Sequence, residues 1–358
     1  MSRRRWESAG WFFGFIGFAA ASIGWMLASN AFAYAWLIML IAWLGWPLGC
    51  MGLLLIHALT GGRWGNAIRP QLLAGARNIW LLPLLLIPYV FAAPQIYPWL
   101  REDRTIHLAN ALYLNGPAFI LRGGVYLVVW CGLEAIVARR VRGENREQSL
   151  ARAAPAGLIA LAITITFASI DAVMSLDPRF ASSVFGLVAI AEMGLFALAV
   201  CILAALISGD AREERLRELG RLLLALTILW AYLDFMQLLI IWQSDLPREA
   251  SWYVLRWSGG WGYVAALIAG GHFLAPFFIL LSSKAQRSPG AMACACALLM
   301  LGALLRSFWL VAPAAEADLH ALVWVAATAI TGVSGFAIVQ AARAWPDIDR
   351  VRAARRHV

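Results

Sequence analysis

The sequence predicts an all-α, polytopic transmembrane protein, and three observations lead to this fold class. Of the 358 residues, 62% are hydrophobic and only 14% are charged, whereas a soluble domain carries roughly 25% charged residues. Apolar runs long enough to cross roughly 30 Å of hydrocarbon recur about ten times along the chain. Basic residues are concentrated in alternate connections between these runs. We therefore expect a single integral membrane domain over residues 1–358, with short loops.

The apolar runs place the expected spans near 10–29, 33–57, 77–97, 117–138, 154–176, 180–208, 219–243, 257–282, 290–311 and 319–341. Prolines interrupt several runs, and membrane helices tolerate proline where neighbours or waters satisfy the freed carbonyl groups. The first run follows three consecutive arginines and is longer than the 7–15 residues typical of a signal-peptide core. We therefore expect it to be a spanning helix and not a cleaved leader.

The distribution of Lys and Arg predicts the orientation. If the ten runs all span, the side that holds the N-terminus receives 22 of the 29 basic residues and the opposite side receives 5. Cytoplasmic loops carry the excess of Lys and Arg in membrane proteins. Both termini are therefore expected in the cytoplasm. Topology also accounts for the net charge of +9, so the sequence does not predict nucleic acid as a partner.

Soluble catalytic chemistry has no support in the sequence. The charged connections 139–148 and 209–219 are too short for a folded domain, and no HExxH, GxSxG, Walker or GxGxxG motif stands in a suitable context. The cysteines lie in apolar runs without CxxC or CxxCH spacing, which predicts neither a disulfide framework nor a metal or haem site; they are Cys50, Cys131, Cys201, Cys294 and Cys296. We therefore predict no catalytic residue, metal ligand or cofactor ligand in this chain.

The stretch 164–178, TITFASIDAVMSLDP, carries a carboxylate where the chain is expected to lie in lipid. An ionised Asp at a helix centre costs about 2.5 to 3.5 kcal/mol on insertion scales, so it must face a bundle interior, a partner or a water-filled cavity. Asp171 is therefore a candidate functional residue. Asp177 and Pro178 close the run.

Other polar groups fall inside the expected spans, mostly in their outer halves. The candidates for a proton relay are Asp171, Asp177, Glu192, Asp234 and His272, and the candidates for structural ion pairs are Arg122, Arg306 and Arg256. One interpretation pairs Asp171 or Asp234 with Arg122 or Arg306. The other is a relay, because a carboxylate shielded from water can take and release protons near neutral pH. Glu134 is expected near Arg139.

Only two histidines lie well inside expected spans, His57 and His272. Haem b needs axial histidines that face each other across helices, and these two are expected at different depths. His272 is therefore interpreted as a hydrogen-bonded core residue or as a proton carrier, in preference to a haem ligand.

A second informative stretch, 232–281, contains two apolar runs around a loop rich in aromatic residues. Aromatic residues normally anchor helices at the membrane interface, which explains Trp242, Trp252 and Trp257. It does not explain the particular order of Gln237, Trp242, Pro247, Glu249, Trp252, Tyr253, Arg256, Gly259-Gly260-Trp261, His272-Phe273 and Pro276-Phe277.

That order, together with SIDAVMSLDP, resembles the second large membrane subunit of bacterial alternative complex III. This quinone-binding subunit 2 is related to the membrane subunit of polysulfide reductase, and the complex is a quinol:cytochrome c or oxidase oxidoreductase. The resemblance is specific over two blocks of the chain. Two positions depart from it: Ala172 stands where an aromatic residue is expected, and Arg179 where a histidine is expected, which changes shape and polarity beside Asp171.

The resemblance implies two four-helix bundles with peripheral helices, in the bacterial cytoplasmic membrane. It implies a non-redox subunit that contributes to quinol binding, proton translocation or both, with Asp171, Asp177, Glu192 and His272 as the carried-over site residues. The implied partners are a homologous polytopic quinol-site subunit, an iron–sulfur subunit and multihaem cytochromes, so haem and iron–sulfur groups are expected on partner subunits. Two alternatives remain: a secondary transporter with an intramembrane acidic and arginine site, and a structural scaffold with neutralised buried charges.

Overall fold

The computed structural model describes residues 3–100, 111–142, 146–209, 213–315 and 317–343, and these residues form helices and no strand. The described elements are α1 (Arg3–Leu27), α2 (Ser29–Thr60), α3 (Arg63–Arg77), η1 (Asn78–Leu81), α4 (Leu82–Ile96), η2 (Pro98–Leu100), α5 (Gly116–Arg142), α6 (Arg146–Ala172), η3 (Met174–Leu176), α7 (Phe185–Ile207), α8 (Glu213–Ser244), α9 (Pro247–Trp257), α10 (Trp261–Leu267), η4 (Ile268–Leu274), α11 (Ala275–Leu281), η5 (Ala285–Arg287), α12 (Pro289–Val311), η6 (Ala312–Ala314) and α13 (Leu319–Arg343).

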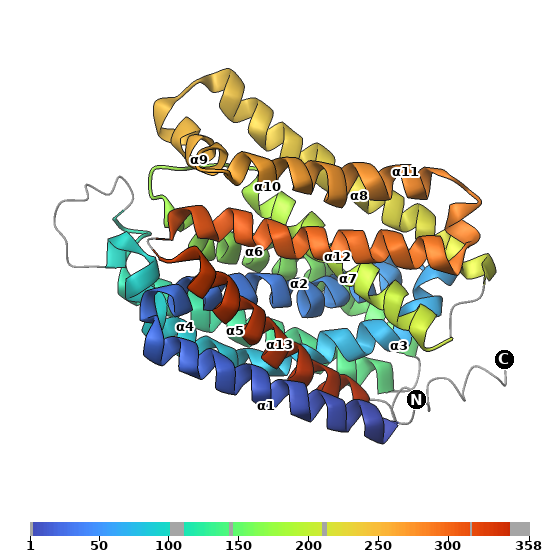
Figure 1. Cartoon of the computed structure of the whole chain (residues 1–358). Helices are drawn as coiled ribbons and strands as arrows, with labels where there is room; N and C mark the ends of the chain where they lie inside the picture. The colour runs from blue at the N-terminus through green and yellow to red at the C-terminus, as the bar shows by residue number, and fades with distance from the viewer. Residues whose placement is uncertain (1–2, 101–110, 143–145, 210–212, 316, 344–358) are drawn as a thin grey trace.

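The prediction of an all-α polytopic protein is confirmed. Within the described residues, ten helical segments are long and apolar enough to cross a membrane. They run side by side, and α1 begins at the same end of the bundle at which α13 finishes (Figure 1). We call this the terminal end, and we call the end that carries α9 the distal end.

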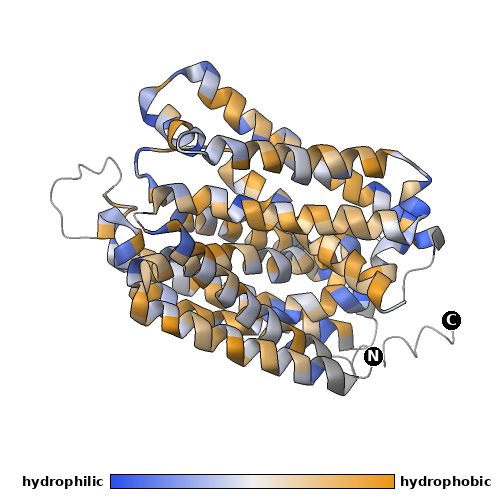
Figure 2. Ribbon diagram, in the orientation of Figure 1, coloured by the Kyte–Doolittle hydropathy of each residue, from blue (hydrophilic) through white to orange (hydrophobic). Residues whose placement is uncertain are grey.

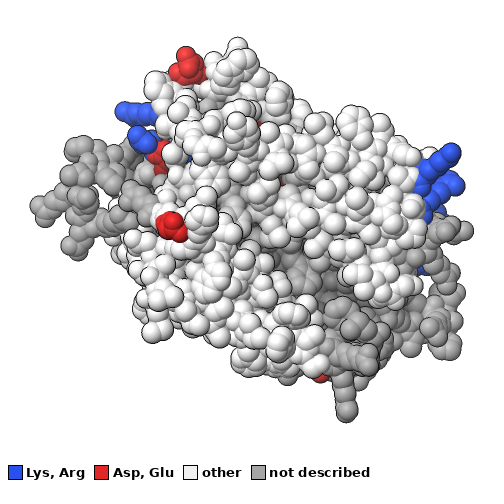
Figure 3. All heavy atoms as spheres, in the orientation of Figure 1, with Lys and Arg blue, Asp and Glu red and all other residues white. Residues whose placement is uncertain are grey.

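Polar and charged residues gather at these two ends. The middle of the helices is dominated by hydrophobic residues (Figure 2). On the face shown in Figure 3, the Lys, Arg, Asp and Glu side chains lie near the ends, and a broad band without charge separates them. Such a band is what a hydrocarbon layer roughly 30 Å thick requires.

Two boundaries differ from the prediction for clear physical reasons. The third span begins at Arg63, because the amphipathic α3 continues through η1 into the apolar α4. Residues 247–257 form a separate helix, α9, at the distal end, where the sequence suggested only a loop. Pro247 starts α9, since proline suits the first turn, and Gly259 and Gly260 end the segment with positive φ angles of 58° and 91°, which favour glycine.

The spans pack as two groups of four and one outer pair. The second to fifth spans, which include α2, α4, α5 and α6, form one group, and the sixth to ninth, which include α7, α8, α10–α11 and α12, form the other. Helix α2 packs against α7 and joins the groups. It is also the most enclosed span, with 72% of its apolar window buried.

Helices α1 and α13 form the outer pair and pack along one another through glycines. A Cβ atom on Gly17 would stand 2.2 Å from the backbone nitrogen of Gly332, and one on Gly335 would stand 2.3 Å from that of Gly14. Small residues allow close helix approach in membranes, where packing and not hydrophobic exclusion drives association. This pair leaves a face of large apolar residues exposed on α1, which suits contact with lipid.

Candidate functional site

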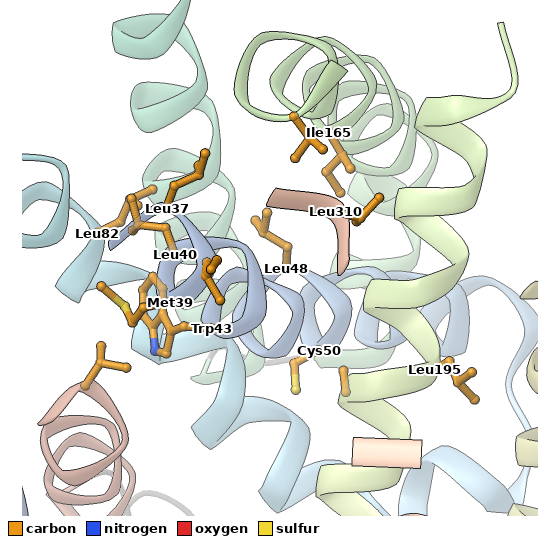
Figure 4. Close-up of a cluster of buried hydrophobic side chains, with 14 of the residues drawn as sticks. Leu37, Met39, Leu40, Trp43, Leu48, Cys50, Leu82, Ile165, Leu195 and Leu310 are labelled. Carbon is orange, nitrogen blue, oxygen red and sulfur yellow. The ribbon is translucent and has the colours of Figure 1, made fainter. Parts of the chain in front are cut away.

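A cavity of about 530 Å³ lies between the two groups of helices, within the roughly 300–1,000 Å³ range of ligand pockets. Helices α2, α4, α5, α6, α7 and α12 contribute its walls. Figure 4 shows some of the apolar side chains that line it, namely Leu37, Leu40, Leu82, Ile165 and Leu310. The charged residues that reach its lining are Asp171, Glu192 and Arg306. Two of the residues that the sequence singled out as relay candidates therefore share one cavity.

Asp171, at the last turn of α6, is held by a complete set of donors. Arg122 of α5 binds it through two hydrogen bonds, Nε to Oδ2 at 2.9 Å and Nη2 to Oδ1 at 2.8 Å. The Tyr126 hydroxyl donates to Oδ2 at 2.7 Å. Asp171 is only 3% exposed. A paired arginine fork and a third donor stabilise the ionised carboxylate, so the structure realises the ion-pair interpretation for this residue.

The surroundings of Asp171 fix the pair in place. Arg122 also donates to the Tyr113 carbonyl at 3.0 Å, and its guanidinium lies 3.9 Å from the centre of the Tyr113 ring. Ser175 donates to the Asp171 backbone carbonyl at 2.6 Å. The Ser175 hydroxyl thus supplies a hydrogen bond to a backbone carbonyl at the C-terminal end of α6. Asp171 and Arg122 together form a neutral anchor between α5 and α6.

Tyr89 of α4 and Tyr97, directly after α4, hold the same turn of α6. Tyr89 and Tyr97 share a hydrogen bond of 2.6 Å, and the Tyr97 hydroxyl donates to the Ala172 carbonyl at 2.8 Å. Burial raises the pKa of Tyr97 well above its usual value, so it remains a donor. Ala172 lines the cavity. An alanine at this position leaves space where the resemblance leads one to expect an aromatic ring.

The second charged group, the quartet Glu192, Asp234, His272 and Arg306, joins four spans. Arg306 Nη2 lies 2.8 Å from Asp234 Oδ1, and its Nε lies 3.6 Å from Glu192 Oε2. His272 Nε2 lies 3.3 Å from Glu192 Oε1. Within the described residues, the buried oxygens of Glu192 and the ring nitrogens of His272 make no hydrogen bond of good geometry. This group is therefore charged and only partly satisfied.

His272 reaches the quartet from a π-helical turn, η4, which interrupts the eighth span. π-Helical turns are frequent at functional sites. The ring of Trp230 packs edge-on against the His272 ring at 4.3 Å, and Gly302 of α12 makes room for it. A Cβ on Gly302 would lie 2.3 Å from the His272 Cβ. The local sequence therefore places an imidazole, 0% exposed, in a tight gap beside Glu192.

Asp177 lies outside the described spans, after η3 at the distal end. Arg179 binds it through Nε and Nη2 at 3.0 and 3.3 Å, and Ser251 donates to it at 3.3 Å. The Arg179 side chain is 68% exposed. The hydrogen bond to Asp177 raises the pKa of Arg179. Arg179 thus supplies a surface partner for Asp177, which does not reach the lining of the cavity.

Arg256 is a cap and not an ion-pair partner. Its guanidinium donates to the carbonyls of Trp252 and of Leu310, near the end of α12, and it lies over the Trp252 ring. Among the described residues no carboxylate lies within salt-bridge distance. Burial lowers the pKa of Arg256 to about 9. Because this value is still above neutral pH, the guanidinium is protonated there. A cation at a helix C-terminus is favourable because the last carbonyls carry partial negative charge.

Helix α9 is held by further polar contacts. Gln237 of α8 accepts from Ser182 at 3.0 Å and donates to Tyr253 at 3.1 Å. Burial, followed by the charge of Asp234, raises the pKa of Tyr253 to about 12. Trp252 is 1% exposed and stacks on Phe180 at 4.4 Å. The interpretation of Trp252 as an interface anchor is therefore wrong, whereas Trp242 and Trp257 are exposed as expected.

Glu134 does not pair with Arg139. It is buried and accepts a hydrogen bond from the indole of Trp80, while Arg139 donates to the Ala135 carbonyl at 3.2 Å. Residues 134 and 139 are five apart, which is not a favourable spacing for contact on one helix face. The sequence did not indicate that Trp80 of η1 would be the hydrogen-bond partner of Glu134.

Potential metal and thiol sites were also considered. Within the described residues, no group of three or more His, Cys, Asp and Glu side chains is placed to hold a metal ion. Cys50 and Cys201 lie with their sulfurs 3.6 Å apart in the packed core between α2 and α7. His57 contacts the Gly62 carbonyl at 3.0 Å, at the turn between α2 and α3. His57 is therefore tied to its own turn, and it lies far along the chain from the η4 segment that carries His272.

Comparison of the sequence with known protein-family profiles and with curated proteins gives no match.

Proposed function

We propose that this chain is a non-redox membrane subunit of a quinol-oxidising respiratory complex of the alternative complex III type, and that its own chemistry is proton transfer through Glu192 and His272. The proposal takes the complex from the sequence resemblance and the proton chemistry from the geometry of the quartet. The observation that carries it is a buried carboxylate at the wall of a cavity and a buried imidazole 3.3 Å from it, both lacking well-formed hydrogen bonds.

The charge balance of the quartet supports a single mobile proton. Arg306 and Asp234 neutralise one another at 2.8 Å. Glu192 then carries an uncompensated negative charge when His272 is neutral. One added proton, shared between Glu192 and His272, makes the whole quartet neutral. A low-dielectric interior favours the neutral state, so the quartet is suited to receive one proton and to pass it on.

Asp171 has a different role in this proposal. Its charge is already matched by Arg122 and its oxygens accept three donors. Protonation would break the arginine fork, which makes Asp171 a poor proton carrier. It instead positions Tyr126 and the end of α6 at the cavity, where a quinol or another bilayer molecule would approach. Asp177, on the surface, contributes at most to the distal rim.

The proposed setting follows the sequence expectations. The chain would lie in the bacterial cytoplasmic membrane with both termini in the cytoplasm. It would bind a homologous polytopic quinol-site subunit, with haem and iron–sulfur groups held by an iron–sulfur subunit and multihaem cytochromes. The transporter alternative typically uses a pair of broken helices. In the described part of the chain, η1 interrupts the third span and η4 interrupts the eighth, but neither turn contributes a residue to the lining of the cavity, so the two do not form a shared substrate site there.

The test measures assembly and proton movement in one preparation. An affinity-tagged chain isolated from native membranes should bring haem-containing and iron–sulfur subunits with it. In liposomes, the complex with Glu192→Gln should assemble and oxidise a soluble hydroquinone, but quinol-driven proton transfer should fall sharply, because the amide keeps the shape and cannot carry the proton.

Glu134→Gln is the matched control, since it makes the same change at another buried glutamate with a neutral partner. It should retain proton transfer. Isolation of the chain without redox subunits would contradict the respiratory assignment. Unchanged proton transfer in Glu192→Gln, or an equal loss in both variants, would contradict the role of Glu192.

A further inference from the structure

The loop between α11 and α12 lies against the start of α8 at the terminal end of the bundle. Gln286 of η5 is 5% exposed and donates to the Leu280 carbonyl at 2.7 Å. A Cβ atom on Gly220 of α8 would stand 3.0 Å from the Gln286 Cγ, so the two segments are in close contact. Because Gln286 is held inward, Lys284 and Arg287 lie at the surface. A fixed turn therefore presents two cations beside α8.

Helix α8 adds two arginines to this surface. Arg217 and Arg221 are one turn apart, on the side of α8 next to Gly220. Within the described residues neither has a carboxylate at salt-bridge distance, and Arg217 Nε is buried without a hydrogen-bond partner. The same holds for the ion pairing of the two cations on the turn. We call this group the corner cations: Arg217, Arg221, Lys284 and Arg287.

The nearest acids leave the corner cations uncompensated. Glu218 lies 2.8 Å from Arg63 of α3, so its charge is already matched. Glu213 and Glu214 stand at the start of α8, about two turns farther from the hydrocarbon than Arg221. Basic side chains gather at the terminal end in Figure 3, where Figure 1 shows the loop after α11. The corner therefore carries an excess of positive charge at the edge of the spans.

The surface on the hydrocarbon side of the corner cations is apolar. Leu224 and Ile228 continue the face of α8 that carries Arg221, three and seven residues farther along. Ile228 is 44% exposed. On α11, which packs against α8, Phe278 and Leu281 are 64% and 60% exposed. The surface thus passes from cations to exposed apolar side chains, in the same order as a phospholipid passes from its phosphate to its acyl chains.

We propose that the corner cations bind the head group of a phospholipid with a net negative charge, whose acyl chains lie along α8 and α11. Phosphate oxygens accept charge-assisted hydrogen bonds from arginine and lysine, and basic pockets between spanning helices bind anionic head groups. A zwitterionic lipid also brings a cation, for which the described corner has no free carboxylate. The orientation rule explains basic loops in general, but it does not explain their convergence around one buried glutamine. This site uses neither the quartet nor the cavity, so it goes beyond the proposed function.

Photolabelling tests the site without any turnover. The purified protein, with the subunits that accompany it, is placed in phosphatidylcholine liposomes. These contain a small amount of phosphatidylglycerol or of phosphatidylcholine with a diazirine at the start of one acyl chain. Mass spectrometry should find residues 217–228 and 278–287 labelled several-fold more strongly by phosphatidylglycerol, and this preference should fall as sodium chloride is raised. Equal labelling by the two lipids would overturn the proposal.

Paired substitutions separate a site from diffuse attraction. Each Lys or Arg near an anionic surface strengthens binding about fivefold, so Arg221→Gln with Lys284→Gln should lower the preference about tenfold or more. Arg139→Gln with Arg152→Gln is the matched control, because it removes the same charge from exposed positions on α5 and α6, and Arg139 already donates to the Ala135 carbonyl at 3.2 Å. The control should keep the preference, and an equal loss in both pairs would overturn the site. The comparison of the two lipids on the unaltered protein decides the question if a double variant fails to fold.

Competition separates a lipid site from a phosphate-ion site. Inorganic phosphate, compared with sodium chloride at the same ionic strength, should not displace the label, because it lacks the acyl chains that contact α8 and α11. Complete displacement by inorganic phosphate would overturn the assignment to a lipid. Glu192→Gln should label as the unaltered protein does, so a failure of the proposed function would leave this result unaffected.

Discussion

Two carboxylates line the same cavity and differ in how completely they are satisfied. Asp171 receives three hydrogen bonds, two of them from one arginine. Glu192 has charged or polar neighbours at 3.3 and 3.6 Å but makes no well-formed hydrogen bond within the described residues. The difference shows that burial alone does not mark a proton carrier. A carboxylate whose partners already fit its ionised form is an anchor, and one with unfilled acceptors can change state.

The two groups also differ in how their partners are shared. Arg122 serves one carboxylate, whereas Arg306 lies between Asp234 and Glu192. A shared arginine can lean towards either acid as a proton arrives or leaves. The Asp234 side chain is 31% exposed, whereas Glu192 and Arg306 of the same quartet line the cavity. An exposed carboxylate inside a span calls for water or a polar partner there.

The largest expected effect breaks the anchor. Asp171→Leu leaves Arg122 buried without its acid, and removing one partner of a buried ion pair costs roughly 3–5 kcal/mol. The variant should accumulate poorly and unfold at a lower temperature in detergent. Yield of monodisperse protein and the free energy of unfolding in mixed micelles measure this.

The matched control removes both partners. Asp171→Leu combined with Arg122→Leu should recover most of the lost stability, because no charge is left unpaired. Glu192→Gln, by contrast, should lower the free energy of unfolding only a little. If Asp171→Leu accumulates and unfolds like the unaltered protein, the description of this pair as a structural anchor fails.

A smaller effect is expected where the quartet depends on a close fit. Gly302→Ala places a methyl group 2.3 Å from the His272 Cβ, so η4 must shift. Overpacking of this kind costs about 1–3 kcal/mol. Proton transfer should fall together with stability, because His272 moves relative to Glu192. Gly270→Ala, in the same π-helical turn but with open surroundings, should alter neither quantity, and an equal loss there would contradict the geometric explanation.

The spans were predictable because each is a long apolar run, and a hydrocarbon layer imposes the same length requirement on every helix. The charged residues of the cavity were predictable for the same reason, since Asp171 and Glu192 interrupt such runs. Arg122 and Arg306 were candidate partners in the sequence, but which arginine pairs with which aspartate was not predictable. Pairing of Asp171 with Arg122 and of Asp234 with Arg306 depends on which helices are neighbours, and this information is spread over the whole fold.

Two further features depend on tertiary packing in the same way. The π-helical turn that aims His272 has no residue pattern of its own and is stabilised by the space at Gly302. The burial of Trp252 under Phe180 requires α9 to fold back on the bundle.

The smallest expected effect lies at the surface and sharpens the comparison with the buried anchor. Arg179 and Asp177 form a salt bridge of similar geometry to that of Arg122 and Asp171, but the arginine is 68% exposed. Exposed pairs contribute about 0–1 kcal/mol. Arg179→Gln should therefore leave the unfolding free energy almost unchanged, since Asp177 keeps the hydrogen bonds from Ser251 and from the backbone of residue 179. Any loss should shrink at high salt, because water and ions screen surface charges. Arg248→Gln removes a charge from the neighbouring α9 segment and controls for net charge. A loss in Arg179→Gln that approaches the loss in Asp171→Leu would show that burial does not separate the two pairs.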